Sequence, residues 1–225
     1  MKIHFLNILL FSLILLSCKK IENVQPQLLE DNGCIERIII PVNTHTIKEV
    51  EITTANNLFL KNNIDNSRFR YYKYSNDSLQ TQFPPYVKIN FKFVRVIEYT
   101  NELRILNSDL IFSFKNEVFN SLSGTQTKGT NLDMKPKLTL GQLRQLFLES
   151  AKIFYGRPII YKDSCLEAEF GYYDIDADSK SKNLIKAWKV TSKNLNNFFE
   201  YPVAYYQDND GKLIYYDDGI TVFLK

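Results

Sequence analysis

The chain has 225 residues and carries 28 Lys and Arg against 25 Asp and Glu, a formal net charge of +3. This balance argues against a dedicated nucleic-acid binder, which would show a basic face or stripe. With 44% apolar and 24% charged residues, the composition is that of a globular protein and excludes wholesale disorder and a coiled coil. Abundant Tyr and Phe with few Gly and Pro favour β-strands.

The N-terminus has the features of a secretory signal peptide. Lys2 precedes an apolar stretch from Phe5 to Leu16, which is too short for a transmembrane helix. The ending Leu15-Leu16-Ser17-Cys18 resembles the bacterial lipobox, whose cysteine is diacylated and becomes the first mature residue. This resemblance implies that residues 1–17 are removed and that lipidated Cys18 anchors the protein to a membrane without spanning it. The alternative is a generic signal peptide with an incidental cysteine.

The residues after Cys18 indicate a location. Lys19 and Lys20 stand where lipoproteins retained at the inner membrane carry Asp, so the pattern resembles that of outer-membrane lipoproteins. Surface-exported lipoproteins can carry acidic residues here, and their absence favours the periplasmic side. Residues 18–33 lack periodicity and are expected to form a tether.

Two further cysteines, Cys34 and Cys165, would lie in a compartment that permits disulfides. We expect them to pair; two free thiols are the alternative. A cysteine-based active site is not expected, because the only mature histidine, His45, is distant in sequence from both and has no nucleophile motif nearby.

The first half of the chain is expected to be rich in strands. In residues 87–99 the odd positions are mostly apolar, which predicts a strand with Lys88, Asn90, Lys92 and Glu98 on its solvent face. Short polar turns then predict an antiparallel meander up to Leu122. The other expected elements are a strand over 35–42, a helix over 55–61 capped by Thr53 or Thr54, and an aromatic and basic run over 68–74.

The second half is expected to be one helix followed by an antiparallel sheet, which makes the class α+β. Thr139 and Gln142 have capping-box spacing, and the apolar stripe that follows is interrupted at Gly156. The expected strands cover residues 159–161, 165–173, 184–191, 198–206 and 212–217.

Two resemblances connect these patterns to protease precursors. The run from Tyr99 to Leu110, with Phe114 and Ser123-Gly124, resembles the hairpin of the fungalysin/thermolysin propeptide domain, although Glu102 replaces the usual glycine and Arg104 the usual proline.

The second half resembles a PepSY domain. The matching segments are the helix from Thr139 to Tyr155, the strand from Leu184 to Val190, and the closing hairpin with Tyr201 to Tyr206, Asp208 and Gly211 to Ile214. The two resemblances imply antiparallel sheets each packed by a helix, as in cystatin-like folds. The expected units are residues 34–124, propeptide-like, and 138–225, PepSY-like, with a linker over 125–137.

In protease precursors such domains assist folding of a zinc protease and inhibit it. No His-Glu-x-x-His motif is present, so we expect a free-standing, non-enzymatic module that acts on a separate protein partner, with a protease considered first. No catalytic residue, cofactor or metal is expected. An enzyme is the least favoured hypothesis.

Two acidic segments and His45 could suggest a metal or catalytic site but are expected to have structural roles. Asp174, Asp176 and Asp178 have the first spacing of a calcium loop, but Ser179 and Ile185 stand where Gly and Glu are required, so a solvated acidic loop is expected. Asp208 to Gly211 is expected to be a hairpin tip, and His45 a surface or strand residue.

The basic and aromatic run offers an alternative function. Arg68, Arg70, Tyr72 and Tyr74 could hold an envelope glycan or a small molecule by charge and stacking. The favoured interpretation is a strand with aromatic residues on its buried face and basic residues outside.

Overall fold

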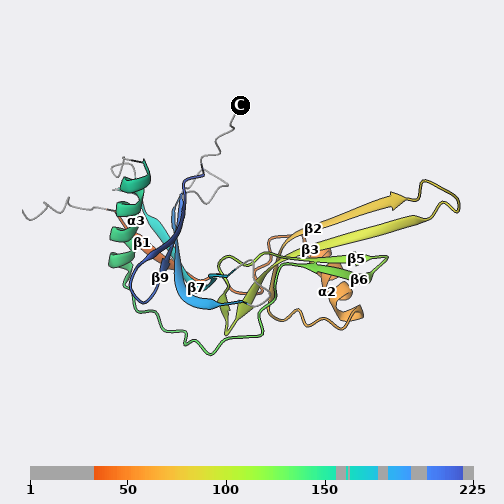
Figure 1. Cartoon of the computed structure of the whole chain (residues 1–225), viewed down its shortest axis with the longest axis horizontal. Helices are drawn as coiled ribbons and strands as arrows, with labels where there is room; N and C mark the ends of the chain where they lie inside the picture. The colour runs from red at the N-terminus through yellow and green to blue at the C-terminus, as the bar shows by residue number, and fades with distance from the viewer. Residues whose placement is uncertain (1–32, 156–160, 162, 177–181, 194–201, 220–225) are drawn as a thin grey trace, which may run out of the picture. The chain divides into compact units, whose positions relative to one another are not determined.

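The computed structural model describes residues 33–155, 161, 163–176, 182–193 and 202–219. In this part of the chain two helices and ten strands form two mostly antiparallel sheets (Figure 1), so the fold is of the mixed α+β class. The helices are α2 (Glu49–Lys61) and α3 (Leu140–Tyr155). The strands are β1 (Ile35–Ile38), β2 (Phe69–Gln80), β3 (Lys88–Thr100), β4 (Leu103–Arg104), β5 (Leu110–Lys115), β6 (Val118–Ser123), β7 (Leu166–Asp174), β8 (Leu184–Ser192), β9 (Val203–Gln207) and β10 (Leu213–Asp217).

Several predictions fall on residues that the structure does not describe. Cys18, the signal peptide and the tether up to residue 32 are among them, as are residues 159–160 of an expected strand. None of the helices formed by the described residues is long and apolar enough to cross a membrane.

The N-terminal sheet has the strand order β2-β3-β5-β6, with β4 paired to β3. Helix α2 covers one face of this sheet and buries Ala55, Leu58 and Phe59. The Phe59 ring lies edge-on to Phe112 at 4.9 Å, which fixes the helix against β5. The expected meander is therefore present, with a helix packed on it.

Helix α2 begins earlier than predicted. The backbone N–H of Lys48 donates to the Glu51 carboxylate at 2.9 Å, which is one half of a capping box. Thr54 lies inside the helix, where its hydroxyl donates to the carbonyl of Val50 at 2.8 Å. The predicted cap at Thr53 or Thr54 was wrong because the acidic side chain three residues after Lys48 supplies the acceptor.

The prediction for the solvent face of β3 is confirmed for Lys88 and Asn90, which are exposed, and was wrong for Glu98. Val94 and Val96, at even positions, are fully buried in the core beneath α2, and Glu98 is fully buried. Phe91 and Phe93, on the predicted core face, are only half-buried. The strand passes through different surroundings along its length, so a single alternation between core and solvent does not describe it.

The C-terminal sheet has the order β1-β7-β8-β9-β10 and is packed by α3. The predicted capping box is confirmed: the Thr139 N–H donates to the Gln142 amide oxygen at 2.9 Å, and the Gln142 N–H donates to the Thr139 hydroxyl at 3.3 Å. Leu143 and Phe147 of α3 are fully buried with Trp188 of β8, so this part of the apolar stripe is core. Phe154, at the end of the stripe, is exposed.

Strand β1 belongs to the C-terminal sheet, although it precedes the whole N-terminal sheet in sequence. It pairs in parallel with β7, with Ile35 opposite Leu166. The expected unit over residues 34–124 therefore does not coincide with one sheet. A β-branched run predicts a strand but carries no information about a partner 131 positions away.

A disulfide joins Cys34 and Cys165 immediately before these two parallel strands. The two Cα atoms are 4.4 Å apart, and the Leu166 N–H donates to the Cys34 carbonyl at 2.8 Å. The bridge therefore holds the start of β1 against the start of β7.

Candidate functional sites

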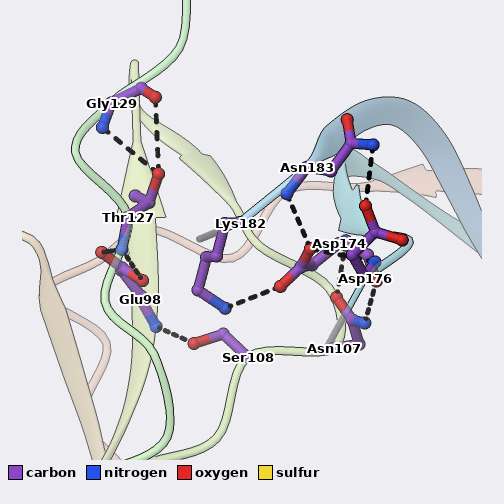
Figure 2. Close-up of polar contacts among 9 residues, drawn as sticks. All are labelled: Glu98, Asn107, Ser108, Thr127, Gly129, Asp174, Asp176, Lys182 and Asn183. Carbon is purple, nitrogen blue, oxygen red and sulfur yellow. Dashed lines mark hydrogen bonds and ion pairs between the residues drawn. The ribbon is translucent and has the colours of Figure 1, made fainter. Parts of the chain in front are cut away.

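A buried polar cluster lies where the two sheets meet (Figure 2). The Glu98 side chain on β3 is fully buried, and its two carboxylate oxygens accept hydrogen bonds from the Thr127 N–H at 2.9 and 3.1 Å. The Arg68 guanidinium lies 3.6 Å from the same carboxylate. Glu98 thereby fixes the segment that follows β6 to the N-terminal sheet.

Burial raises the pKa of Glu98 to about 7, because it desolvates the charged form. The Thr127 N–H and the positive charges of Arg68 and Lys182 oppose this rise, and the negative charge of Asp174 adds to it. The carboxyl group has no exposed surface that a substrate could reach. The cluster is suited to holding the fold together and to responding to pH.

Asp174, at the end of β7, is the second carboxylate of the cluster and is 3% exposed. It accepts hydrogen bonds from the Asn183 N–H at 2.9 Å and forms an ion pair with Lys182 at 3.3 Å. The expected solvated acidic loop was therefore wrong for Asp174, which needs these partners because it is buried. Asp176 is exposed, and Asp178 lies outside the described residues.

Backbone contacts continue the junction between the sheets. The Leu106 N–H donates to the Tyr172 carbonyl at 2.7 Å, and Arg104 pairs with Glu169 at 3.0 Å. A Cβ atom on Gly171 would lie 2.5 Å from the Arg104 carbonyl oxygen, so only glycine permits this approach. Asn107 adds two hydrogen bonds to the backbone of Asp174, at 2.8 and 2.9 Å.

Asp208 is a buried carboxylate at a position that the sequence pattern predicts to be a hairpin tip. The turn is present, with Gly211 at a φ of 72°, but Asp208 itself is fully buried. Its carboxylate accepts hydrogen bonds from the indole N–H of Trp188 at 2.9 Å and from the N–H groups of Lys137 and Leu138 at 2.9 and 3.2 Å. Asp208 thus fixes the entrance to α3 against β8.

The four candidate glycan-binding residues all have partners within the chain. Arg68 donates to the Thr127 carbonyl at 3.3 Å, and Arg70, which is 9% exposed, donates to the Thr44 carbonyl at 2.5 Å. The Tyr72 hydroxyl donates to Asp109, and Tyr74 packs against the core beneath α2.

A β-bulge explains why these residues do not share one face. Their spacing of two would place them on the same side of a regular strand. The pairing of β2 with β3 shifts between Tyr71 and Lys73, and this shift turns Tyr74 to the core face that Phe69 and Tyr71 occupy. The sequence shows the alternation but not the extra residue.

His45 lies in the loop before α2 and is half-buried. Its Nδ1 accepts the Tyr71 N–H at 3.0 Å, and its ring stacks on the Tyr71 ring with centroids 4.5 Å apart. Burial and the Arg70 charge lower the pKa of His45, which favours the neutral form that can accept this bond. These contacts assign it a structural role.

The hairpin of β2 and β3 is the second candidate site. Beyond the end of β5, no other described strand pairs with these two, and every residue from Ser75 to Gln80 is exposed. The connecting loop, Thr81–Val87, which we call the hairpin tip, exposes large apolar side chains: Phe83 by 78%, Tyr86 by 64% and Val87 by 47%. The long hairpin is visible in yellow in Figure 1.

The outer edges of the N-terminal sheet differ. The pairing of β6 with β5 shifts between Ser113 and Phe114 of β5. The backbone N–H of Phe119 on β6 donates to the side-chain oxygen of Asn62 at 2.7 Å. On β2 no described residue pairs with the outer edge from Ser75 to Gln80, which we call the open edge. Asn90 pairs with Ser78, but its backbone N–H and C=O form hydrogen bonds with Asn116 on the other side of β3. In an antiparallel pair this means that the backbone N–H and C=O of Ser78 point away from β3, toward the open edge.

Alternation then assigns the remaining outward groups of the open edge. The N–H and C=O groups of Asn76 and Gln80 point outward like those of Ser78. The Ser78 N–H is occupied by the Asp77 side chain at 2.8 Å. Asn76 and Gln80 are therefore the open donors of this edge.

One group of side chains has metal-ligand proximity. Ligand atoms of Cys34, Glu36 and Cys165 lie within 4.8 Å of one another. Both sulfurs are consumed by the disulfide, so they do not supply the thiolates that a metal site would use.

No protein-family model matches the chain, and no curated protein matches it.

Proposed function

We propose that this protein is a non-enzymatic lipoprotein, anchored at Cys18 to the periplasmic side of a bacterial outer membrane, that grips a protein partner by strand addition to the open edge of β2. The partner considered first is a secreted zinc metalloprotease, which the chain would inhibit or help to fold. The proposed architecture is a propeptide-like unit followed by a PepSY-like, cystatin-like unit.

The open edge is the observation that carries the protein-binding function. An unpaired edge strand offers a row of backbone donors and acceptors to an extended segment of another chain. The distal part of the hairpin is a two-stranded ribbon that neither described helix covers, and such ribbons are marginally stable alone. A third strand from a partner would satisfy the outward groups of Asn76 and Gln80.

The location and the type of partner are supported by the sequence. The lipobox-like ending at Cys18 and the basic residues after it support an outer-membrane anchor. The propeptide and PepSY resemblances support a protease as the partner. In the C-terminal half, α3 precedes β7, β8, β9 and β10, which is the helix-then-sheet order expected from the sequence.

The test is a titration of residues 19–225 against thermolysin and other secreted zinc metalloproteases, with hydrolysis of a fluorogenic peptide as the readout. Saturable inhibition at sub-micromolar concentration without cleavage of the fragment is expected. Asn76→Pro removes one outward donor and should weaken inhibition, whereas Asn76→Thr retains the N–H and should not.

Unfolding curves of both variants serve as the control, because proline must be shown to leave the fold intact. Flat curves for the wild type across the panel would contradict protease inhibition. Equal inhibition by Asn76→Pro and Asn76→Thr would contradict the assignment to the open edge.

A further inference from the structure

The hairpin tip combines exposed apolar side chains with a backbone that is partly satisfied by Thr81. The Thr81 hydroxyl donates to the Pro85 carbonyl at 2.9 Å and accepts the Val87 N–H at 2.8 Å. The Thr81 N–H donates to the Val87 carbonyl at 3.1 Å. One side chain thus closes the loop from within, and the polar backbone groups that it binds need less water.

Such a loop is suited to the boundary between water and lipid. Placing backbone in an apolar medium is costly unless its polar groups are paired, and Thr81 pairs several of those in the tip. Phe83 and Tyr86 flank the two prolines, and aromatic residues are favoured at the level of lipid headgroups. A large exposed apolar cluster marks a contact with protein or membrane.

Charge favours a membrane as the occupant. No acidic residue occurs from Ser78 to Ile97, while Lys88 directly follows the tip and is exposed. Further from the tip, exposed Lys115 and Asp77 pair with Phe91 from opposite sides, so Lys88 carries the net positive charge beside the tip. Anionic lipid headgroups attract a lysine in this position.

We infer that the hairpin tip inserts into the headgroup region of an anionic lipid bilayer and so forms a second membrane contact beside the lipid anchor. The inference rests on the anchor of the proposed function, which keeps the protein near a bilayer. Phe83 and Tyr86 enter the interface, and Lys88 contacts lipid phosphates. The open edge of β2 would remain in the aqueous phase.

The test uses full-length lipidated protein reconstituted in vesicles of phosphatidylethanolamine and phosphatidylglycerol. Phe83→Trp reports the depth of the tip, because the natural Trp188 is 1% exposed and supplies a constant background. We expect a shift of the added emission to shorter wavelength and quenching by lipids with brominated acyl chains. Ile153→Trp, on an exposed position of α3, is the matched control and should be quenched by aqueous acrylamide instead.

Lys88→Glu in the Phe83→Trp background should reduce quenching by brominated lipids. The inference is overturned if Phe83→Trp, in protein that floats with the vesicles, is quenched by acrylamide as strongly as Ile153→Trp. Failure of the protein to float would contradict the lipid anchor at Cys18, on which the inference rests. A wavelength shift that needs an added envelope protein would overturn it in favour of a protein contact. Protease inhibition is measured without lipid, so the two proposals fail separately.

Discussion

Strands β8 and β2 differ in how many of their edges are paired and in how much of each strand is buried. Strand β8 has β7 and β9 as neighbours, and five of its nine residues are buried. Strand β2 has only β3 as a described neighbour, and its last six residues are exposed. Strand β8 therefore belongs to the part of the molecule that stabilises the fold, and the distal half of β2 to the part that is available for binding.

Removing the disulfide should lower the free energy of unfolding more than any other change considered for the part that stabilises the fold. In the chain-entropy model, a bridge between residues 131 positions apart contributes up to about 5 kcal/mol. The double variant Cys34→Ser and Cys165→Ser should lower the free energy of unfolding by roughly 2–5 kcal/mol in urea titrations. A loss below about 1 kcal/mol would contradict a stabilising role for the bridge.

Asp208→Ala should be the next most destabilising change. It leaves the Trp188 indole N–H and two backbone N–H groups without their buried acceptor, which costs about 3 kcal/mol or more. Asp210→Ala is the matched control, because Asp210 accepts one exposed backbone bond from Lys212. Equal losses for the two variants would contradict the role of Asp208.

The junction between the sheets should make stability depend on pH. The pKa of Glu98 is raised to about 7 in the folded state, so the folded protein retains this proton while the unfolded chain loses it. The contribution is fully present below pH 4.5 and is lost as the pH rises to about 7, by on the order of 3 kcal/mol.

Glu98→Gln should remove that part of the pH dependence. The measurement is the free energy of unfolding against pH for both proteins, and the difference between the curves isolates Glu98 from the other carboxyl groups. Parallel curves between pH 4.5 and 7 would rule out an elevated pKa for Glu98.

The smallest effect on stability is expected at the hairpin tip. Phe83→Ser should change the free energy of unfolding by no more than about 0.5 kcal/mol, because the ring is 78% exposed. Phe59→Ala, in the core beneath α2, should cost about 3–5 kcal/mol in the same assay. A large loss for Phe83→Ser would mean that the tip packs against the chain.

Local signals in the sequence predicted the elements well. The capping pair of Thr139 and Gln142 located α3, and the polar turns located the meander from β3 to β6. These signals depend on residues close in sequence, so they can be recognised without knowledge of the tertiary structure.

The candidate sites depended on long-range pairing and were mostly missed. Glu98 is buried because Thr127 and the C-terminal sheet cover it, and Asp208 is buried because Trp188 and the segment before α3 converge on it. The alternation of apolar and polar residues predicted that Glu98 faces solvent, and the turn motif up to Gly211 predicted that Asp208 lies in a turn. A buried carboxylate and an exposed one have the same local pattern, so the sequence could not distinguish them.

Amide hydrogen exchange of the free protein tests the central claim most directly. The open edge predicts that the Asn76 and Gln80 amides exchange near their unfolded rates, while the Val190 amide in β8 is protected to nearly the global free energy of unfolding. If the Asn76 amide is protected as strongly as that of Val190, another part of the chain covers the edge of β2, and the strand-addition account is wrong.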